Sequence, residues 1–321
     1  MRIIDMHCDT LMKGWNVPGK NLYDANDFSI NIKLLKEHNS LVQFFAMYLR
    51  RDIDGNLRDV HEAYEILDGM HAYYTKQMEL NKHLIKPAYS VSDILKNKEE
   101  GLMSSILTIE DGTFVDGNLD NLNKVYDKGV RLVTLLWGFE NSMGYPCEED
   151  VVLNKKGLKP FGFEAIERMN DLGIIVDVSH TSEGGFYDVA KASKKPFVAS
   201  HSCAKALCKA PRNLTDDQLK VLGESGGYVG VNFECSFLKD GSTHATYDQV
   251  MEHLVHMKNK AGIEAIGFGS DFDGIDDSGE MVDYSGFDRM LLELEKHFTP
   301  REIDMICSGN ALRVMRDIFG K

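Results

Sequence analysis

The chain has 321 residues, 43% of them hydrophobic, which is enough to bury the core of one α/β barrel or of two ordinary domains. Its formal net charge is −14 and its pI is about 5.2, so its surface repels nucleic acid and anionic lipid, and neither is an expected partner. No apolar run is long enough for a signal peptide or a membrane-spanning helix, and the six cysteines form no C-x-x-C pair. We therefore expect a cytoplasmic protein with reduced thiols.

Short apolar runs alternate along the chain with longer segments of helical periodicity. Strands are predicted at 2–6, 41–48, 103–109, 131–136, 174–178, 196–200, 228–233 and 265–269. Helices are predicted at 59–82, 91–97, 119–126, 161–171, 182–192, 215–224, 246–261, 286–296 and 300–318. Eight alternations without a linker predict one (β/α)₈ TIM-like barrel domain over residues 1–321. A doubly wound sheet is the alternative, but it usually has a glycine-rich loop after its first strand, where this chain has His7-Cys8-Asp9-Thr10.

Polar residues cluster where the predicted strands end, which is where barrel enzymes carry their catalytic groups. His7 and Asp9 should point the same way, because side chains alternate along an extended chain. Other strand ends supply Glu110, His180, His201 and Asp271. Imidazoles and carboxylates without thiolates suit Zn²⁺ or Mn²⁺, and three histidines with only two of these carboxylates already exceed the needs of one tetrahedral zinc ion. The pattern therefore favours two metal ions.

Several neighbouring residues have simpler interpretations. Asp111 and Asp273 are predicted to cap the helices that follow them. The stretch from Asp271 to Asp276 departs from a calcium loop, since Asp276 stands where glycine is needed. His253 and His256 are predicted to lie on the surface of an amphipathic helix. The chain has no H-E-x-x-H, G-x-S-x-G or P-loop motif, which argues against classical zincins, serine hydrolases and P-loop enzymes.

The motifs, taken in order from residue 4 to residue 314, resemble the signatures of the renal (membrane) dipeptidase family. They read Ile4-Asp5-Met6-His7-Cys8-Asp9-Thr10-Leu11, Glu110-Asp111-Gly112, Asp177-Val178-Ser179-His180, Ser200-His201-Ser202, Ala210-Pro211-Arg212-Asn213-Leu214, Gly267-x-Gly269-x-Asp271-Phe272-Asp273-Gly274 and Gly309-Asn310-x-Leu312-Arg313-Val314. The resemblance implies an amidohydrolase-type barrel that acts as a binuclear zinc metallopeptidase. It would hydrolyse dipeptides with a free C-terminal carboxylate through a metal-bridging hydroxide.

The resemblance also implies a ligand set for two Zn²⁺ ions per chain. His7 and Asp9 would bind one ion, His180 and His201 would bind the other, and Glu110 would bridge both as a ligand and catalytic residue.

Two further roles follow from the resemblance. Arg212 would hold the carboxylate of the substrate, a task that suits its planar pair of donors. Asp271 would be the general acid/base that passes a proton from the attacking water to the departing amine.

Trp137 departs from the family pattern, because the family usually has a substrate-contacting histidine at this position. An indole cannot carry positive charge, although its N–H donates one hydrogen bond. If the loop 138–146 moves Trp137 away, Asn141 or Tyr145 would supply the missing donor. Trp137 and Asn141 are therefore expected to contact substrate.

Two other functions remain open from the sequence. One is a different binuclear amidohydrolase-type enzyme that acts on a lactone, a cyclic amide or a phosphoester. The other is a non-catalytic binding protein that keeps its metals. The sequence also leaves open whether the chain forms a homodimer.

Overall fold

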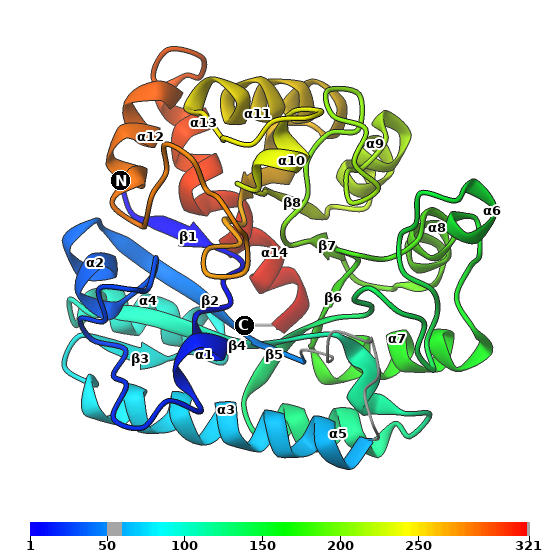
Figure 1. Cartoon of the computed structure of the whole chain (residues 1–321), viewed down its shortest axis with the longest axis horizontal. Coiled ribbons are helices and arrows are strands. Elements are labelled where there is room, and N and C mark those ends of the chain that lie inside the picture. The colour runs from blue at the N-terminus through cyan, green and yellow to red at the C-terminus, as the bar shows by residue number, and fades with distance from the viewer. Residues whose placement is uncertain (50–59, 320–321) are drawn as a thin grey trace.

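Eight parallel strands form a closed barrel in the computed structural model, which describes residues 1–49 and 60–319 (Figure 1). The closing pairs are β2 with β4 and β1 with β9. In chain order the barrel strands are β1 (Ile3–Asp5), β2 (Ser40–Tyr48), β4 (Met103–Glu110), β5 (Val130–Thr134), β6 (Ile175–Asp177), β7 (Val198–Ala199), β8 (Tyr228–Val231) and β9 (Ile266–Phe268). Each overlaps a predicted strand, and the predicted TIM-like barrel is confirmed.

One further strand, β3 (Ile85–Pro87), was not predicted. It pairs with the first residues of β4. β5 pairs with the same edge of β4, but farther along the strand. Three residues are too few for a detectable alternation of side chains. The segment therefore could not be recognised from its sequence.

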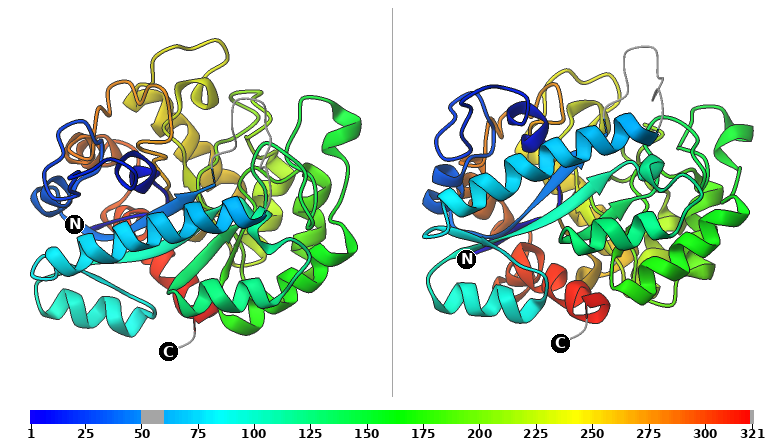
Figure 2. Two further views of the ribbon diagram at one scale, coloured as in Figure 1. Left: turned by 60° about the horizontal axis from the view of Figure 1, so that its bottom comes forward. Right: turned by 90° about the horizontal axis from the view of Figure 1, so that it is seen from below.

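The long helices follow the predicted order and surround the strands (Figures 1 and 2). They are α3 (Val60–Leu80), α4 (Val91–Glu99), α5 (Asp120–Asp127), α7 (Pro160–Leu172), α8 (Glu183–Ala192), α9 (Asp216–Glu224), α11 (Tyr247–Ala261) and α12 (Gly286–Leu294). The predicted start of the first, residue 59, lies outside the described residues. None of the helices in 1–49 and 60–319 is long and apolar enough to cross a bilayer.

The predicted helix over 300–318 is divided into three parts. α13 (Pro300–Asp304) and α14 (Asn310–Phe319) are separated by a π-helical turn, Met305–Gly309. Four short helices in the loops escaped prediction because they hold six residues or fewer. They are α1 (Thr10–Gly14), α2 (Ile32–Glu37), α6 (Val151–Asn154) and α10 (Cys235–Leu238), and the 3₁₀ turns are Gly112–Val115 and Ile263–Ala265.

The barrel interior is apolar at the end where the strands begin. Residues from seven strands pack there against α14, which is drawn in red near the centre of Figure 1. These residues are Ile4, Val42, Phe44, Ile106, Leu132, Ile175, Val198 and Tyr228 on the strands and Ala311, Val314, Met315 and Ile318 on α14. A larger apolar cluster includes side chains of the strands and of the surrounding helices. The opposite end of the barrel is therefore where polar groups can gather.

Candidate metal centre and active site

The polar side chains predicted from the strand ends meet at one end of the barrel. His7 follows β1, Glu110 ends β4, His180 follows β6, His201 follows β7 and Asp271 follows β9. Because all eight barrel strands are parallel, their C-terminal ends deliver these groups to the same place. His7 and His201 are fully buried.

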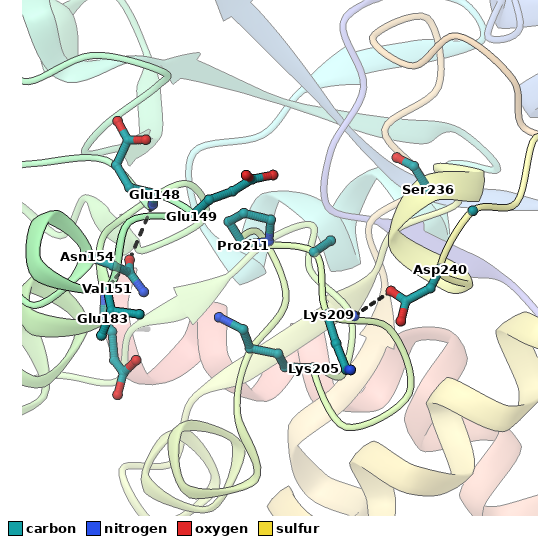
Figure 3. A pocket seen from close by; sticks show the side chains of 12 residues that line it. Glu148, Glu149, Val151, Asn154, Glu183, Lys205, Lys209, Pro211, Ser236 and Asp240 are labelled. Carbon is teal, nitrogen blue, oxygen red and sulfur yellow. Dashed lines mark hydrogen bonds between the residues drawn. The ribbon is translucent and has the colours of Figure 1, made fainter.

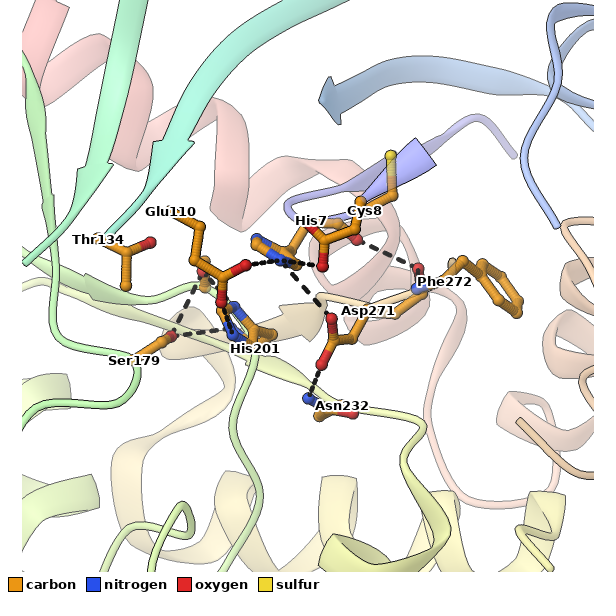
Figure 4. A network of polar contacts seen from close by, with 12 residues as sticks. His7, Cys8, Glu110, Thr134, Ser179, His201, Asn232, Asp271 and Phe272 are labelled. Atoms are coloured by element: carbon orange, nitrogen blue, oxygen red, sulfur yellow. Dashed lines mark hydrogen bonds and ion pairs between the residues drawn. The ribbon is translucent and has the colours of Figure 1, made fainter. Parts of the chain in front are cut away.

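Glu110 lies at the centre of the cluster, and its two carboxylate oxygens face different imidazoles (Figure 4). Oε1 is 2.8 Å from His180 Nε2 and 3.4 Å from His201 Nε2. Oε2 is 3.5 Å from His7 Nε2. Two groups of ligand atoms share this residue, one with His7 and Asp9 and one with His180 and His201, and within each the atoms lie within 4.8 Å of one another. This arrangement can hold two cations bridged by one carboxylate.

His7 Nε2 faces three carboxylates: Asp9 at 3.5 Å, Glu110 at 3.5 Å and Asp271 at 3.6 Å. Among the described residues no hydrogen bond of normal length reaches either ring nitrogen of His7 or Asp9 Oδ1, although all three atoms are buried. Burial opposes protonation of His7, but the charges of Glu110 and Asp9 outweigh it and raise its pKa well above 6.5. Burial, reinforced by the charge of Asp9, raises the pKa of Glu110 to about 8. Crowded carboxylates with unpaired buried atoms fit a metal site.

His201 is oriented by a chain of hydrogen bonds behind it. The Ser200 hydroxyl lies 2.6 Å from Asp177 Oδ2 and 2.8 Å from His201 Nδ1. A carboxylate only accepts, so the hydroxyl donates its one proton to Asp177 and accepts from Nδ1–H. This leaves Nε2 unprotonated and facing Glu110. Burial lowers the pKa of His201 and of His180 well below 6.5, which also keeps both rings neutral and able to bind a metal.

The backbone at the site is bent in ways that the sequence did not reveal. His180 and Asp271 have φ values of 67° and 62°, in the left-handed region that non-glycine residues seldom adopt. Gly274 lies so close to the cluster that a Cβ atom there would be 2.1 Å from Asp9 Oδ2. A side chain at this position would therefore displace Asp9.

Asp271 is held by Asn232, the residue that follows β8. Asn232 Nδ2 donates to Asp271 Oδ2 at 2.8 Å, and the backbone N–H of Asp271 donates to the carbonyl of His7 at 3.2 Å. Figure 4 shows the Asp271 carboxylate between His7 and Asn232. Burial raises the pKa of Asp271 to about 6, and the charge of His7 opposes this rise.

A cavity of about 300 Å³ opens beside the cluster of candidate metal ligands. Among the described residues it is lined by Asp9, Met12, Tyr48, Glu110, Trp137, His180, Glu234, Ser236, Phe237, Asp271, Gly274, Ile275 and Asp276. Trp137 packs edge-on against Tyr48, with ring centroids 4.9 Å apart, and lies 6.0 Å from the ring of His180. The cavity therefore has aromatic walls and room for a small molecule next to the candidate metal ligands.

Arg212 lies beside the histidines but does not line this cavity. Its Nη2 donates to the carbonyl of His201 at 3.1 Å, and its guanidinium carbon is 5.5 Å from the ring centroid of Phe237. It borders a much smaller hollow together with His180. Its Nε is buried and has no hydrogen-bond partner among residues 1–49 and 60–319, which leaves a donor available for a ligand.

The structure does not bring Asn141 to the cavity lining. Its Nδ2 donates to the carbonyl of Leu135 at 2.8 Å, and its Oδ1 accepts from the backbone of Met143 at 2.8 Å. The side chain thus stabilises the loop after β5. The ammonium groups of Lys156 and Lys159 lie over the ring of Tyr145, and Tyr145 is also absent from the described lining of the cavity.

Two simpler predictions were wrong, although Asp111 does cap the 3₁₀ turn that follows it. Asp273 caps no helix; it accepts hydrogen bonds from Thr10 at 2.6 Å and from Lys13 at 2.8 Å, and so ties α1 to the loop after β9. His253 is fully buried rather than exposed, since its ring bonds to the backbone of Ala204 and Leu238. Helical periodicity cannot show that a loop covers a polar position.

Most of the residues that support the cluster stand in the family-like motifs, but the sequence assigned them no role. Asp5 accepts from Gln43 and Ser270, and Asp177 accepts from Ser179 and Ser200. Both aspartates are fully buried. The sequence did contain a signal for these two residues: each is a carboxylate inside an apolar strand. Such a group needs hydrogen-bond partners when the strand is buried.

The sequence model of the membrane dipeptidase family, peptidase family M19, matches residues 1–319. An uncharacterized dipeptidase of Schizosaccharomyces pombe is 34% identical over 255 residues, which are 78% of this chain and 60% of that protein, so the chain spans less than two thirds of this relative. The crystal structure of dipeptidase AC, an M19 metallopeptidase, is 25% identical over 100% of this chain and 99% of that chain, with a TM-score of 0.92. A Rhodobacter sphaeroides metallopeptidase, solved with a phosphinate mimic of the dipeptide L-Ala-D-Ala, is 24% identical over 99% of each chain, with a TM-score of 0.92. The chain therefore belongs to the membrane dipeptidase family of metallopeptidases.

Proposed function

We propose that the protein is a dipeptidase that binds two zinc ions. His7, Asp9 and Glu110 are the ligands of one ion, and Glu110, His180 and His201 are the ligands of the other. The observation that carries this proposal is the Glu110 carboxylate, whose two oxygens face separate groups of ligand atoms. When bound, the zinc ions act as Lewis acids that lower the pKa of water and polarise the scissile carbonyl.

Asp271 and Arg212 perform the remaining tasks. Asp271 takes a proton from the attacking water and delivers it to the leaving nitrogen, and the hydrogen bond from Asn232 to Oδ2 leaves Oδ1 directed at the cluster. Arg212 holds the substrate carboxylate through donors that the carbonyl of His201 does not use. The cavity wall formed by Trp137 and Tyr48 shields the peptide bond from bulk water.

The test combines metal analysis with a panel of small substrates. Zinc-loaded protein is assayed on L-Ala-L-Ala, on L-Ala-D-Ala and on their C-terminally amidated forms, with a lactone and a phosphoester as controls. The proposal expects hydrolysis of free dipeptides and weak hydrolysis of amidated ones, with an increased KM for free dipeptides in Arg212→Ala. Equal rates on free and amidated dipeptides would refute the role of Arg212. Turnover of only the lactone or the phosphoester would replace dipeptidase activity by that chemistry.

A further inference from the structure

The active-site cavity contains more carboxylates than the proposed chemistry uses. Its described lining includes Asp9, Glu110, Asp271, Glu234 and Asp276, and no lysine or arginine among the described residues. The first three belong to the groups of ligand atoms around the metal cluster. Glu234 and Asp276 are left without a task in the reaction.

Glu234 is held in place with one oxygen available. It caps α10, where its Oε1 accepts from the backbone of Ser236 at 3.1 Å. Its own backbone N–H donates to Asn232 Oδ1 at 2.7 Å, and the amide of the same Asn232 holds Asp271. Among the described residues, no hydrogen bond or ion pair engages Oε2. Glu234 is thus a positioned carboxylate linked through one side chain to the proposed general acid/base.

Aromatic rings complete the wall that holds these carboxylates. Tyr48, Trp137 and Phe237 line the same cavity. The first two pack edge to face, while the ring of Phe237 already has the guanidinium of Arg212 5.5 Å from its centroid. The faces of aromatic rings attract ammonium and guanidinium groups, and carboxylates pair with them. Aromatic and acidic groups around one small cavity therefore favour a cationic ligand.

Charge counting identifies which cation is needed. A dipeptide with neutral side chains carries one ammonium and one carboxylate at neutral pH. The proposed partner of the carboxylate is Arg212, which lies outside this lining in the small hollow that meets the cavity at His180. One of Glu234 and Asp276 suffices to pair with the ammonium, so the other carboxylate remains for a second positive charge on the ligand. We infer that Glu234 and Asp276 are specificity-determining residues that select dipeptides with a positively charged side chain such as lysine or arginine. This inference rests on the proposed dipeptidase function.

A neighbouring hollow of about 500 Å³ provides a contrast and a control (Figure 3). Ser236 borders both spaces, but the second one mixes Lys205 and Lys209 with acidic residues that include Glu149. Its two lysines offset two of its four carboxylates, whereas the lining of the active-site cavity has no such cation among the described residues. Glu149→Gln removes the same charge as Glu234→Gln without altering the lining of the active-site cavity.

The experiment compares kcat/KM for substrates that differ only in one charge. Zinc-loaded wild-type protein is assayed on Lys-Ala and Ala-Lys, each against the matched dipeptide in which norleucine replaces lysine. We expect one lysine dipeptide to be preferred about tenfold over its norleucine match, equivalent to ~1.4 kcal/mol. The preference should fall with rising salt. Glu234→Gln and Asp276→Asn should each reduce the ratio, and Glu149→Gln should leave it unchanged.

Gln retains an oxygen that can accept from Ser236, so the cap of α10 is preserved in Glu234→Gln. If the wild type cleaves Lys and norleucine dipeptides equally well, the inference is overturned while dipeptidase activity stands. A lysine preference that survives both Glu234→Gln and Asp276→Asn overturns the assignment of these residues. If no dipeptide is cleaved by protein that contains two zinc ions, the proposed function fails and the inference fails with it.

Discussion

Ser200→Ala tests the hydrogen-bond chain that orients His201. The hydroxyl stands between Asp177 Oδ2, at 2.6 Å, and His201 Nδ1, at 2.8 Å. Its removal leaves Nδ1–H without a partner and frees the proton to move between the two ring nitrogens. The neutral ring then samples the tautomer in which Nε2 carries the proton and cannot bind zinc.

The size of the effect follows from the position of the hydroxyl. Loss of a group that orients a ligand typically lowers metal affinity by about 10- to 100-fold, which is ~1.4–2.7 kcal/mol. The loss should fall on the zinc ion bound by His180 and His201. The other ion should be less affected, because its ligands His7 and Asp9 lie on a different strand end and make no contact with Ser200 among the hydrogen bonds of the described residues.

Ser179→Ala is the matched control. The Ser179 hydroxyl donates to the same aspartate at 2.9 Å and accepts from the backbone of His201 at 3.2 Å, but it does not contact the ring. Each substitution removes one buried hydroxyl near Asp177, so the two should lower the free energy of unfolding by similar amounts, ~1 kcal/mol. Only Ser200→Ala should also weaken zinc binding.

The assay titrates zinc-free protein with zinc in competition with a chromophoric chelator, alongside thermal unfolding of each variant. Wild-type protein should show two tight sites, Ser200→Ala one tight and one weakened site, and Ser200→Thr a return towards wild type. Equal loss of zinc affinity in Ser179→Ala and Ser200→Ala, or no loss in either, would refute the proposed orientation of His201.

Four other substitutions have distinct expected results. Glu110→Gln should lower zinc content from two ions per chain, measured by elemental analysis, because a neutral amide cannot bridge two cations. Asp271→Asn should keep both ions but lower kcat by about 10²–10⁴-fold; unchanged kcat would remove its catalytic role. Trp137→His should raise kcat/KM for small neutral dipeptides if an imidazole restores a donor at the carbonyl, and a lower rate on every substrate would make Trp137 structural. Burial lowers the pKa of His253 to about 4, so the folded state excludes a proton that the unfolded state binds below pH 6.5. Stability should therefore fall by about 3 kcal/mol between pH 6.5 and 4, and denaturant unfolding of His253→Gln should show a shallower fall.

The sequence alone determined the barrel and the types of residue in the centre. Apolar runs of five to eight residues alternate with helical periods, and this local pattern predicted the eight barrel strands. The alternation of side chains also predicted that His7 and Asp9 would lie together, with Cys8 on the other side. In the structure His7 and Asp9 are 3.5 Å apart, while Cys8 packs in the apolar cluster. These features depend on neighbours in the chain, which is why they could be read from it.

Only the tertiary structure decided how the groups face one another. The contacts of Ser200 with Asp177 and of Asn232 with Asp271 join residues 23 and 39 positions apart. His253 is buried because backbone 49 positions away covers it. Such partners meet only when the barrel closes and its loops fold over the strand ends, and no local pattern records that meeting. The acidic lining formed by Glu234 and Asp276 arises in the same way, since their loops follow different strands and converge only around the finished cavity.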